Sequence, residues 1–240
     1  MGQLAMHSLA VLALLLGGCS KSDSGDILTS GMYGSINARA EGDGRTRVIT
    51  SLFLGQPIDL NFIQLSADDK LVVHHAGQEM TPSEGDILNI VSYTATFSTD
   101  AEGEMFEVSL QRTVDAGAPS SIATLPTPFT LTAPPATSSR AAAMTLTWSP
   151  GGSANAMSAV IDGACIDQVT VPITGDPGSV TIAAGMIKKK TAQQGQTIAD
   201  SCTAEVRIER SKTGTLDSHF GKGGSVLGIQ SRKATFTTNL

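Results

Sequence analysis

The sequence predicts an all-β protein, built as two antiparallel β-sandwich-like domains that follow a cleaved signal peptide and a flexible tether. Two observations support this fold class. Apolar and polar residues alternate strictly over several segments, which is the period of a half-buried β-strand. The 25 glycines and 10 prolines among 240 residues provide the turns that many short strands require.

The composition excludes several other classes of protein. A hydrophobic content of 40% and a charged content of 16% lie in the globular range, outside disordered, collagen-like and coiled-coil compositions. A net charge of −6 does not suit a surface that must neutralise phosphates. We therefore expect no nucleic-acid partner.

The first 19 residues contain a short apolar run followed by small residues and a cysteine. Residues 9–16 read LAVLALLL, a run with the length of a signal-peptide core and too short to span a bilayer as a helix. The following LGGC at 16–19 resembles the lipobox of bacterial lipoproteins. This resemblance implies that residues 1–18 are removed as a signal peptide and that Cys19 receives a diacylglyceryl thioether and an acylated amine. The expected membrane partner is therefore lipid, held through palmitate-type chains on Cys19, since two or three chains give stable anchoring.

The residues after Cys19 indicate where the anchored protein is placed. A polar run, SKSDSGD, begins at Ser20 and predicts a flexible tether over residues 19–30. The lipoprotein family keeps inner-membrane members in place with Asp as the second mature residue, whereas this chain has Ser20. The resemblance therefore implies an outer-membrane anchor in a Gram-negative envelope, and it leaves open which side of that membrane the protein faces.

Two cysteines remain after Cys19. Cys165 and Cys202 would be exported to an oxidising compartment, where disulfides persist. The alternative, a metal-binding or redox pair, lacks a C-x-x-C spacing and a nearby histidine. We therefore predict a Cys165–Cys202 disulfide, with a stabilisation of about 4 kcal/mol in the chain-entropy model.

The N-terminal β domain, residues 31–118, shows two hairpin patterns. The first joins residues 36–40 to 47–54 across EGDGR, and the second joins 91–97 to 106–110 across STDAEGE. Strict alternation over 91–97 and 106–110 predicts a long antiparallel hairpin with one face in solvent, and the turn EGDGR is the signal for the other hairpin.

The C-terminal domain, residues 119–240, follows a linker at 113–128 that reads TVDAGAPSSIATLPTP and places the boundary near Pro119. Its seven or eight predicted strands have the spacing of an immunoglobulin-like sandwich. The stretches PFTLTAP and MTLTWSP resemble the first two strands of fibronectin type III and bacterial immunoglobulin-like domains. That resemblance implies that Trp148 packs between two sheets. The mature chain also resembles an uncharacterised family of bacterial lipoproteins, through DGRTRV at 43–48 and GTLD at 214–217, which brings no activity with it.

The sequence predicts no catalytic residue, no metal ligand and no cofactor. It contains no G-x-S-x-G nucleophile turn and no complete phosphate-binding glycine loop. His74 and His75 are adjacent on a predicted strand and would point to opposite faces, so we expect strand or rim residues rather than a ligand pair. His219 lies in a turn-rich stretch and is expected to be a solvated loop residue.

Three charged clusters can be interpreted either as ordinary turn or loop residues or as binding sites. Glu41 with Asp43, and Asp68 with Asp69, could bind calcium, but turn chemistry explains them more directly because Asp favours chain reversals. The run Lys188–Lys190 is expected to lie in a solvated loop, with a contact to anionic lipid or glycan as the alternative.

These observations predict a non-enzymatic binding or scaffolding protein of the cell envelope, with an envelope protein or a glycan as the expected partner. Two alternatives stay open. One is a periplasmic or surface hydrolase that uses scattered carboxylates, which a sequence motif would not reveal. The other is an accessory subunit of an outer-membrane assembly, which would show an exposed sheet edge or a large apolar patch.

Overall fold

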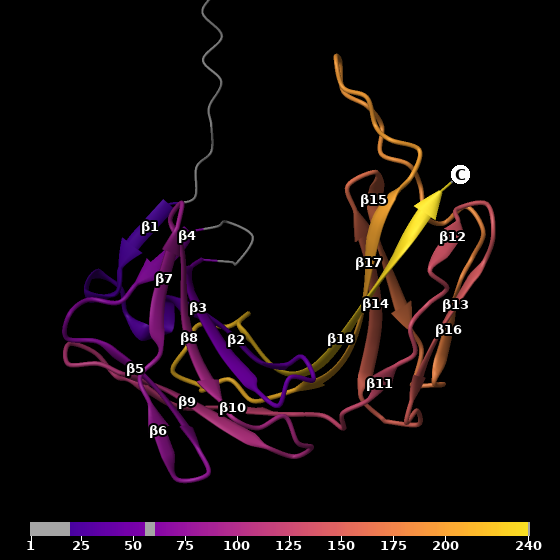
Figure 1. Ribbon diagram of the computed structural model, residues 1–240. Helices are drawn as coiled ribbons and strands as arrows, with labels where there is room; N and C mark the ends of the chain where they lie inside the picture. Colours follow the sequence, from indigo (N-terminus) through magenta and orange to yellow (C-terminus); the bar gives the residue numbers. More distant parts are fainter. Residues whose placement is uncertain (1–19, 56–60, 240) are drawn as a thin grey trace, which may run out of the picture.

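The predicted all-β class is confirmed. The computed structural model describes residues 20–55 and 61–239, and this part of the chain contains β-strands and two single 3-10 turns, η1 (Ser24–Asp26) and η2 (Thr29–Gly31), without an α-helix. The described residues contain no apolar helix of membrane-spanning length. The molecule has the outline of a U, with the first described strand, β1 (Ser20–Asp23), and the C-terminal end of the last strand at its open side (Figure 1).

One eleven-stranded sheet runs through the whole U. Its main path, in spatial order, is β1 (Ser20–Asp23), β4 (Asn61–Gln64), β3 (Thr46–Leu54), β2 (Met32–Ala40), β18 (Ser225–Asn239), β17 (Cys202–Thr213), β14 (Ala156–Gly163) and β15 (Ile166–Ile173). Three further strands extend it: β8 (Ile90–Phe97) beside β3, β7 (Ser83–Ile87) beside β8, and β12 (Thr137–Ser139) beside β18.

Two small sheets complete the fold. The first has the order β10 (Ala118–Thr124), β9 (Met105–Gln111), β5 (Lys70–His75) and β6 (Gln78–Met80), and the second has the order β11 (Thr130–Leu131), β13 (Met144–Ser149) and β16 (Ser179–Ile182). Each small sheet packs on the large one across its own hydrophobic cluster. We call the part around the cluster of Ile36, Phe97 and Phe106 the first arm, and the part around Trp148, Ile161 and Ile208 the second arm.

Strand β18 contributes side chains to the cores of both arms. Val226 belongs to the core of the first arm and Phe236 to that of the second, and their even spacing places both side chains on the same face of one strand. Where the chain crosses between the arms, Thr124 lies against Gly228, at which a Cβ atom would collide with the Thr124 carbonyl oxygen. Because the small sheets cover the same face of the large sheet, the opposite face is left to line the hollow of the U.

The large sheet is mixed, which corrects the prediction of purely antiparallel sheets. Strand β18 pairs in parallel with β2 and with β12, and β1 pairs in parallel with β4. Parallel partners need a long connection, so the two strands of such a pair lie far apart in the sequence. A local alternation pattern identifies each strand but not a partner nearly two hundred residues away.

The first predicted hairpin is confirmed and the second is wrong. Strands β2 and β3 pair from Met32 with Leu54 to Ala40 with Thr46. Strands β8 and β9 instead lie in different sheets, and their apolar faces meet across the core, where the rings of Phe97 and Phe106 are 5.4 Å apart. Alternation shows that a strand has one apolar face, but it does not distinguish a neighbour in the sheet from a partner across the core.

Residues 20–31 have defined positions, which differs from the flexible tether predicted over 19–30. Lys21 and its neighbours form β1, and Ser24 and Thr29 are buried. The Arg112 guanidinium organises this segment, with its Nε 3.0 Å from Asp69 Oδ2 and its Nη1 donating to the Ile27 carbonyl. Ser24 Oγ donates to the same Asp69 carboxylate at 2.7 Å. A buried ion pair therefore fastens the start of the described chain to the first arm.

The predicted domain boundary near Pro119 falls inside β10, which pairs with β9 in the first arm. The cores change over between Leu125, in the first cluster, and Phe129, in the second. Phe220 and Val226, late in the sequence, also pack in the first arm. Trp148 lies in the core of the second arm, 4% exposed, on the strand that the sequence predicted.

Candidate functional site

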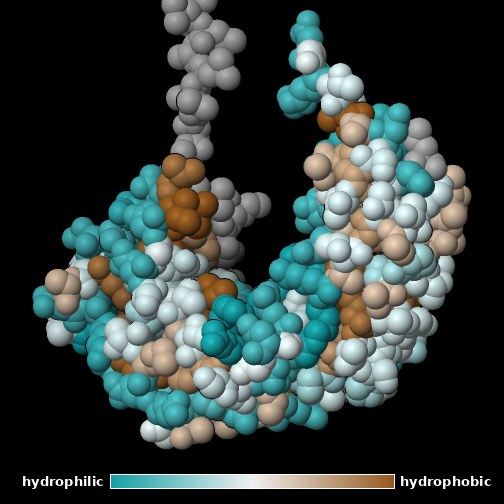
Figure 2. All heavy atoms as spheres, in the orientation of Figure 1, coloured by the Kyte–Doolittle hydropathy of each residue, from teal (hydrophilic) through white to brown (hydrophobic). Residues whose placement is uncertain are grey.

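The hollow of the U is lined by a polar face of the large sheet. Alternation directs every second side chain of these strands away from the two cores. We call this side the inner face, and its charged members are Arg39, Arg47, Asp162, Glu205, Arg207, Glu209 and Lys233. Figure 2 shows hydrophilic residues along the hollow between the arms.

One ion-pair network on the inner face joins strands of both arms. Glu209 Oε1 on β17 lies 2.6 Å from Arg39 Nη1 on β2 and 3.0 Å from Arg207 Nε on its own strand. The side chains of Arg39 and Glu209 keep 24% and 19% of their surface exposed. The network is therefore partly screened by solvent and is still open to a binding partner.

A second network lies beside it on the β2–β3 turn. Glu41 is 3.8 Å from both Arg47 and Lys233, and Arg47 Nη2 donates to Asp43 at 2.8 Å. This hydrogen bond from Arg47 holds the pKa of Asp43 below its ordinary value. Glu41 and Asp43, which we interpreted from the sequence as turn residues, therefore also form ion pairs with Arg47 and Lys233 on the inner face.

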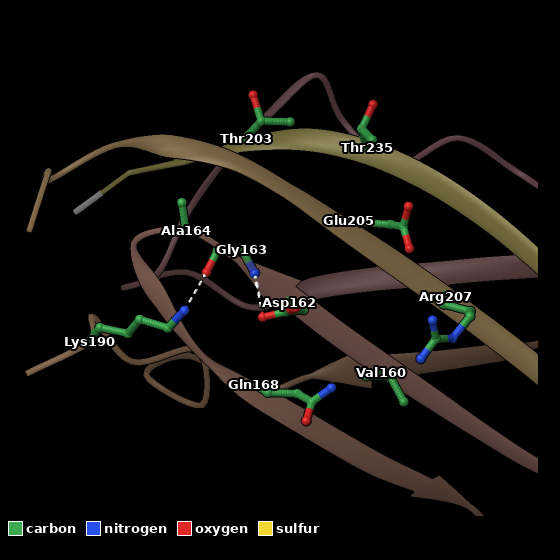
Figure 3. A pocket seen from close by; sticks show the side chains of 10 residues that line it. All are labelled: Val160, Asp162, Gly163, Ala164, Gln168, Lys190, Thr203, Glu205, Arg207 and Thr235. Atoms are coloured by element: carbon green, nitrogen blue, oxygen red, sulfur yellow. Dashed lines mark hydrogen bonds between the residues drawn. The ribbon is translucent and has the colours of Figure 1, made fainter. Parts of the chain in front are cut away.

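A cavity of about 550 Å³ lies on the inner face of the second arm (Figure 3). Strands β14, β15, β17 and β18 and the loop after β16 provide its lining: Val160, Asp162, Gly163, Ala164, Gln168, Lys190, Thr203, Glu205, Arg207 and Thr235. The lining has charges of both signs and no aromatic ring. Such a surface recognises a ligand by hydrogen bonds and charge rather than by stacking.

Two carboxylates are direct neighbours in this cavity. Asp162 on β14 pairs in register with Glu205 on β17, and like charges placed directly opposite each other destabilise a sheet. Arg207 and Lys190 bring positive charge to the same lining. In Figure 3 the Asp162 side chain accepts from the Gly163 amide at 2.8 Å, and the Glu205 carboxylate lies above the same hollow.

The predicted disulfide lies close to the cavity in the sequence, next to the lining residues Ala164 and Thr203, but its cysteines pack in the core of the second arm. Cys165 and Cys202 are joined, with Cα atoms 5.8 Å apart and a sequence separation of 37, as the sequence predicted. Cys165 O accepts from the Lys190 amide at 3.0 Å, and Lys190 Nζ donates to Gly163 O at 3.0 Å. The backbone carbonyls of Cys165 and Gly163 therefore hold Lys190 at the cavity rim. The sequence predicted a solvated loop for this lysine, with a contact to anionic lipid or glycan as the alternative, and did not predict that it lines this cavity.

The other sequence candidates lie elsewhere. His75 stacks on Phe106 with ring centroids 4.6 Å apart, whereas His74 on the other face is near Glu79. His219 is a loop residue, half-exposed and hydrogen-bonded to Asp217. In the described ranges no three of the His, Cys, Asp and Glu side chains are placed to hold a metal ion. Cys19, the predicted lipidation site, lies outside the described residues.

Comparisons with known proteins give no family. No protein-family model matches the sequence, and no curated protein is similar to it. Among solved structures, a cytokine receptor complex is 13% identical over 85% of this chain and 94% of that one, with a TM-score of 0.31. SGBP-B of the Bacteroides ovatus mixed-linkage glucan utilization locus, solved with a heptasaccharide, is 12% identical over 97% and 70% of the two chains, with a TM-score of 0.22.

A third similar structure is the Yersinia pseudotuberculosis adhesin InvE, 11% identical over 87% of this chain and 59% of the adhesin, with a TM-score of 0.22. The chain thus spans less than two thirds of that protein. These likenesses are limited to construction from β-sandwiches.

The charge arrangement of the inner face predicts opposite effects for two neighbouring glutamates. Replacing Glu205 with Gln removes the repulsion from Asp162 and should raise the free energy of unfolding by about 0.5 kcal/mol. Replacing Glu209 with Gln removes the partner of Arg39 and should lower it by about 0.5–1 kcal/mol. Urea denaturation at low salt measures both, and a change of the same sign in the two variants would contradict this account.

Proposed function

We propose that this chain is a lipid-anchored, non-enzymatic binding protein of the bacterial cell envelope, which presents the inner face to an envelope protein. The anchor is an acylated Cys19 at the outer membrane. The binding surface is the row of charged side chains that crosses from β3 to β14.

The observation that supports the binding surface is the continuity of the inner face. Glu209 of β17 and Arg39 of β2 form an ion pair across the join between the arms, so the two arms present one surface. Charges of both signs in a fixed pattern suit a protein partner with the complementary pattern, because such patterns set orientation and suppress wrong partners. A glycan is the alternative partner, and the lining offers it hydrogen-bonding groups but no ring on which a sugar could stack.

The carboxylates of Asp162 and Glu205 also have the composition that a hydrolase would need. We favour binding because the charged surface extends far beyond this pair, over strands of both arms. A catalytic pair needs only a local cleft around a scissile bond. The salt-bridge networks around Arg39 and Arg47 lie outside such a cleft and would not take part in hydrolysis.

The anchor can be tested by labelling. With radioactive palmitate in the growth medium, we expect the exported full-length protein to take up label and to fractionate with outer membranes. The Cys19→Ser variant should take up none and keep its signal peptide, because the thiol that forms the thioether is absent. Equal labelling and identical processing of the two proteins would disprove the anchor.

The binding surface can be tested by photo-crosslinking in the native envelope. A benzoylphenylalanine in place of Thr235, which is exposed in the inner-face cavity, should give a discrete adduct that protease removes. The matched control replaces Thr145, which is exposed on the outer side of β13 in the same arm. Equal adducts at both positions, or none at Thr235, would contradict the proposal, and an adduct that resists protease but is cleaved by periodate would identify a glycan instead.

A further inference from the structure

The turn between β7 and β8 exposes an unusual group of large apolar side chains. Ile87, Leu88 and Ile90 are 73%, 85% and 47% exposed, and Ile87 pairs with Ile90 across a two-residue turn. We call Ile87–Ile90 the apolar tip. Figure 2 shows hydrophobic residues gathered at this end of the first arm. Burial in the core cannot explain these residues, because the core lies on the other side of β8, around Tyr93 and Phe97.

The backbone of the tip makes Leu88 costly for folding. Leu88 and Asn89 have φ values of 55° and 65°, which is the left-handed pair of a type I′ turn. Such turns favour Asn and Gly, because a branched carbon chain is strained in the left-handed region. Asn89 fits this preference and Leu88 does not. A bulky apolar residue that is both strained and nearly fully exposed indicates selection for contact with something outside the fold.

The neighbouring residues identify what the tip contacts. Asp86, next to Ile87, forms an ion pair of 2.9 Å with Lys21 Nζ on β1, so the tip lies beside the first described strand. Ser20 begins that strand, and Cys19 is one peptide bond away, which spans about 3.8 Å between Cα atoms. Because β1 is paired with β4 and no flexible segment separates it from Cys19, acyl chains on Cys19 would enter the membrane next to the tip.

We infer that the apolar tip inserts into the interface of the membrane that holds Cys19, as a second, non-covalent membrane contact. This inference rests on the proposed lipid anchor. Apolar side chains enter the boundary between headgroups and acyl chains favourably, and the tip offers three of them on the hairpin of β7 and β8. In Figure 1 strand β1 and the turn between β7 and β8 both lie at the open end of the U, so the inner face would meet a partner that rises from the membrane.

Tryptophan quenching by brominated lipid tests the insertion. The full chain, exported and acylated, is purified with Ile87→Trp or Leu88→Trp and reconstituted in phosphatidylethanolamine and phosphatidylglycerol vesicles with dibrominated acyl chains. Ile87 lies in regular strand, so it provides a second probe if Trp strains the turn at Leu88. The matched control is Met105→Trp, 54% exposed and next to Phe106, which contacts Phe97 at the opposite end of β8. The signal of the natural Trp148 is subtracted with the unsubstituted protein.

We expect at least twofold stronger quenching at the tip than at position 105. Equal quenching in a protein whose mass shows the acyl groups would overturn the tip insertion and leave the anchor intact. A mass without acyl groups would disprove the anchor, and the insertion with it. A blue-shifted, concentration-dependent emission of the tip tryptophan without vesicles would show that a second copy of the chain covers the tip, which also overturns the inference.

Discussion

The ion pair between Arg210 and Asp176 is the interaction on which the shape of this protein depends. Both side chains are fully buried, with Arg210 Nη2 2.6 Å from Asp176 Oδ2. The same guanidinium donates to the carbonyl oxygens of Thr127, in the crossing between the arms, and Pro150, in the second arm. Asp176 in turn accepts from the indole of Trp148 at 2.7 Å. A charge that deep is tolerated only where partners surround it, so these segments are held to one arrangement.

This polar junction lies between the two apolar cores, which share strand β18. Along the covered face of β18, Val226 packs in the first arm and Phe236 in the second, while the buried Gln230 lies between them. Gln230 pairs in register with Arg210, and its amide donates to the Asp100 carbonyl of the first arm. Polar contacts with directional hydrogen bonds thus fix the angle at which the two cores meet. Because this angle is fixed, the inner face on the other side of the sheet is continuous from one arm to the other. Its charged side chains can therefore contact a single partner.

The individual strands could be predicted from the sequence, but most of the pairings between distant strands could not, for physical reasons. Alternation located β2, β3, β8 and β9, and the turn EGDGR fixed the pairing of β2 with β3. It misassigned β9 because an apolar face looks the same whether it is partnered within a sheet or across a core. The disulfide followed from counting thiols in a chain that the sequence predicts to be exported, and Trp148 from a short resemblance.

The inner face could not be predicted, because its members come from strands scattered along the chain. Arg39 and Glu209 are 170 residues apart, and their meeting depends on the parallel pairing of β2 with β18, for which no local pattern exists. The burial of Arg210 could not be predicted either. A charged residue in an alternating strand normally lies in solvent, and the partners of Arg210 come from distant segments. The apolar tip lies just outside the segment 91–97 that alternation located, so its Ile and Leu residues gave no signal until the structure showed them exposed.

The most direct test of this account is the denaturant-induced unfolding of Arg210→Met beside Arg207→Met, followed through the fluorescence of Trp148. The two arginines lie on the same strand and face opposite sides of the sheet. If Arg210 fixes the junction, its loss leaves the Asp176 carboxylate buried without its cation and lowers the free energy of unfolding by about 3–5 kcal/mol, whereas the loss of Arg207 costs less than about 1 kcal/mol. Equal, small losses in the two variants would contradict the central role of the buried pair.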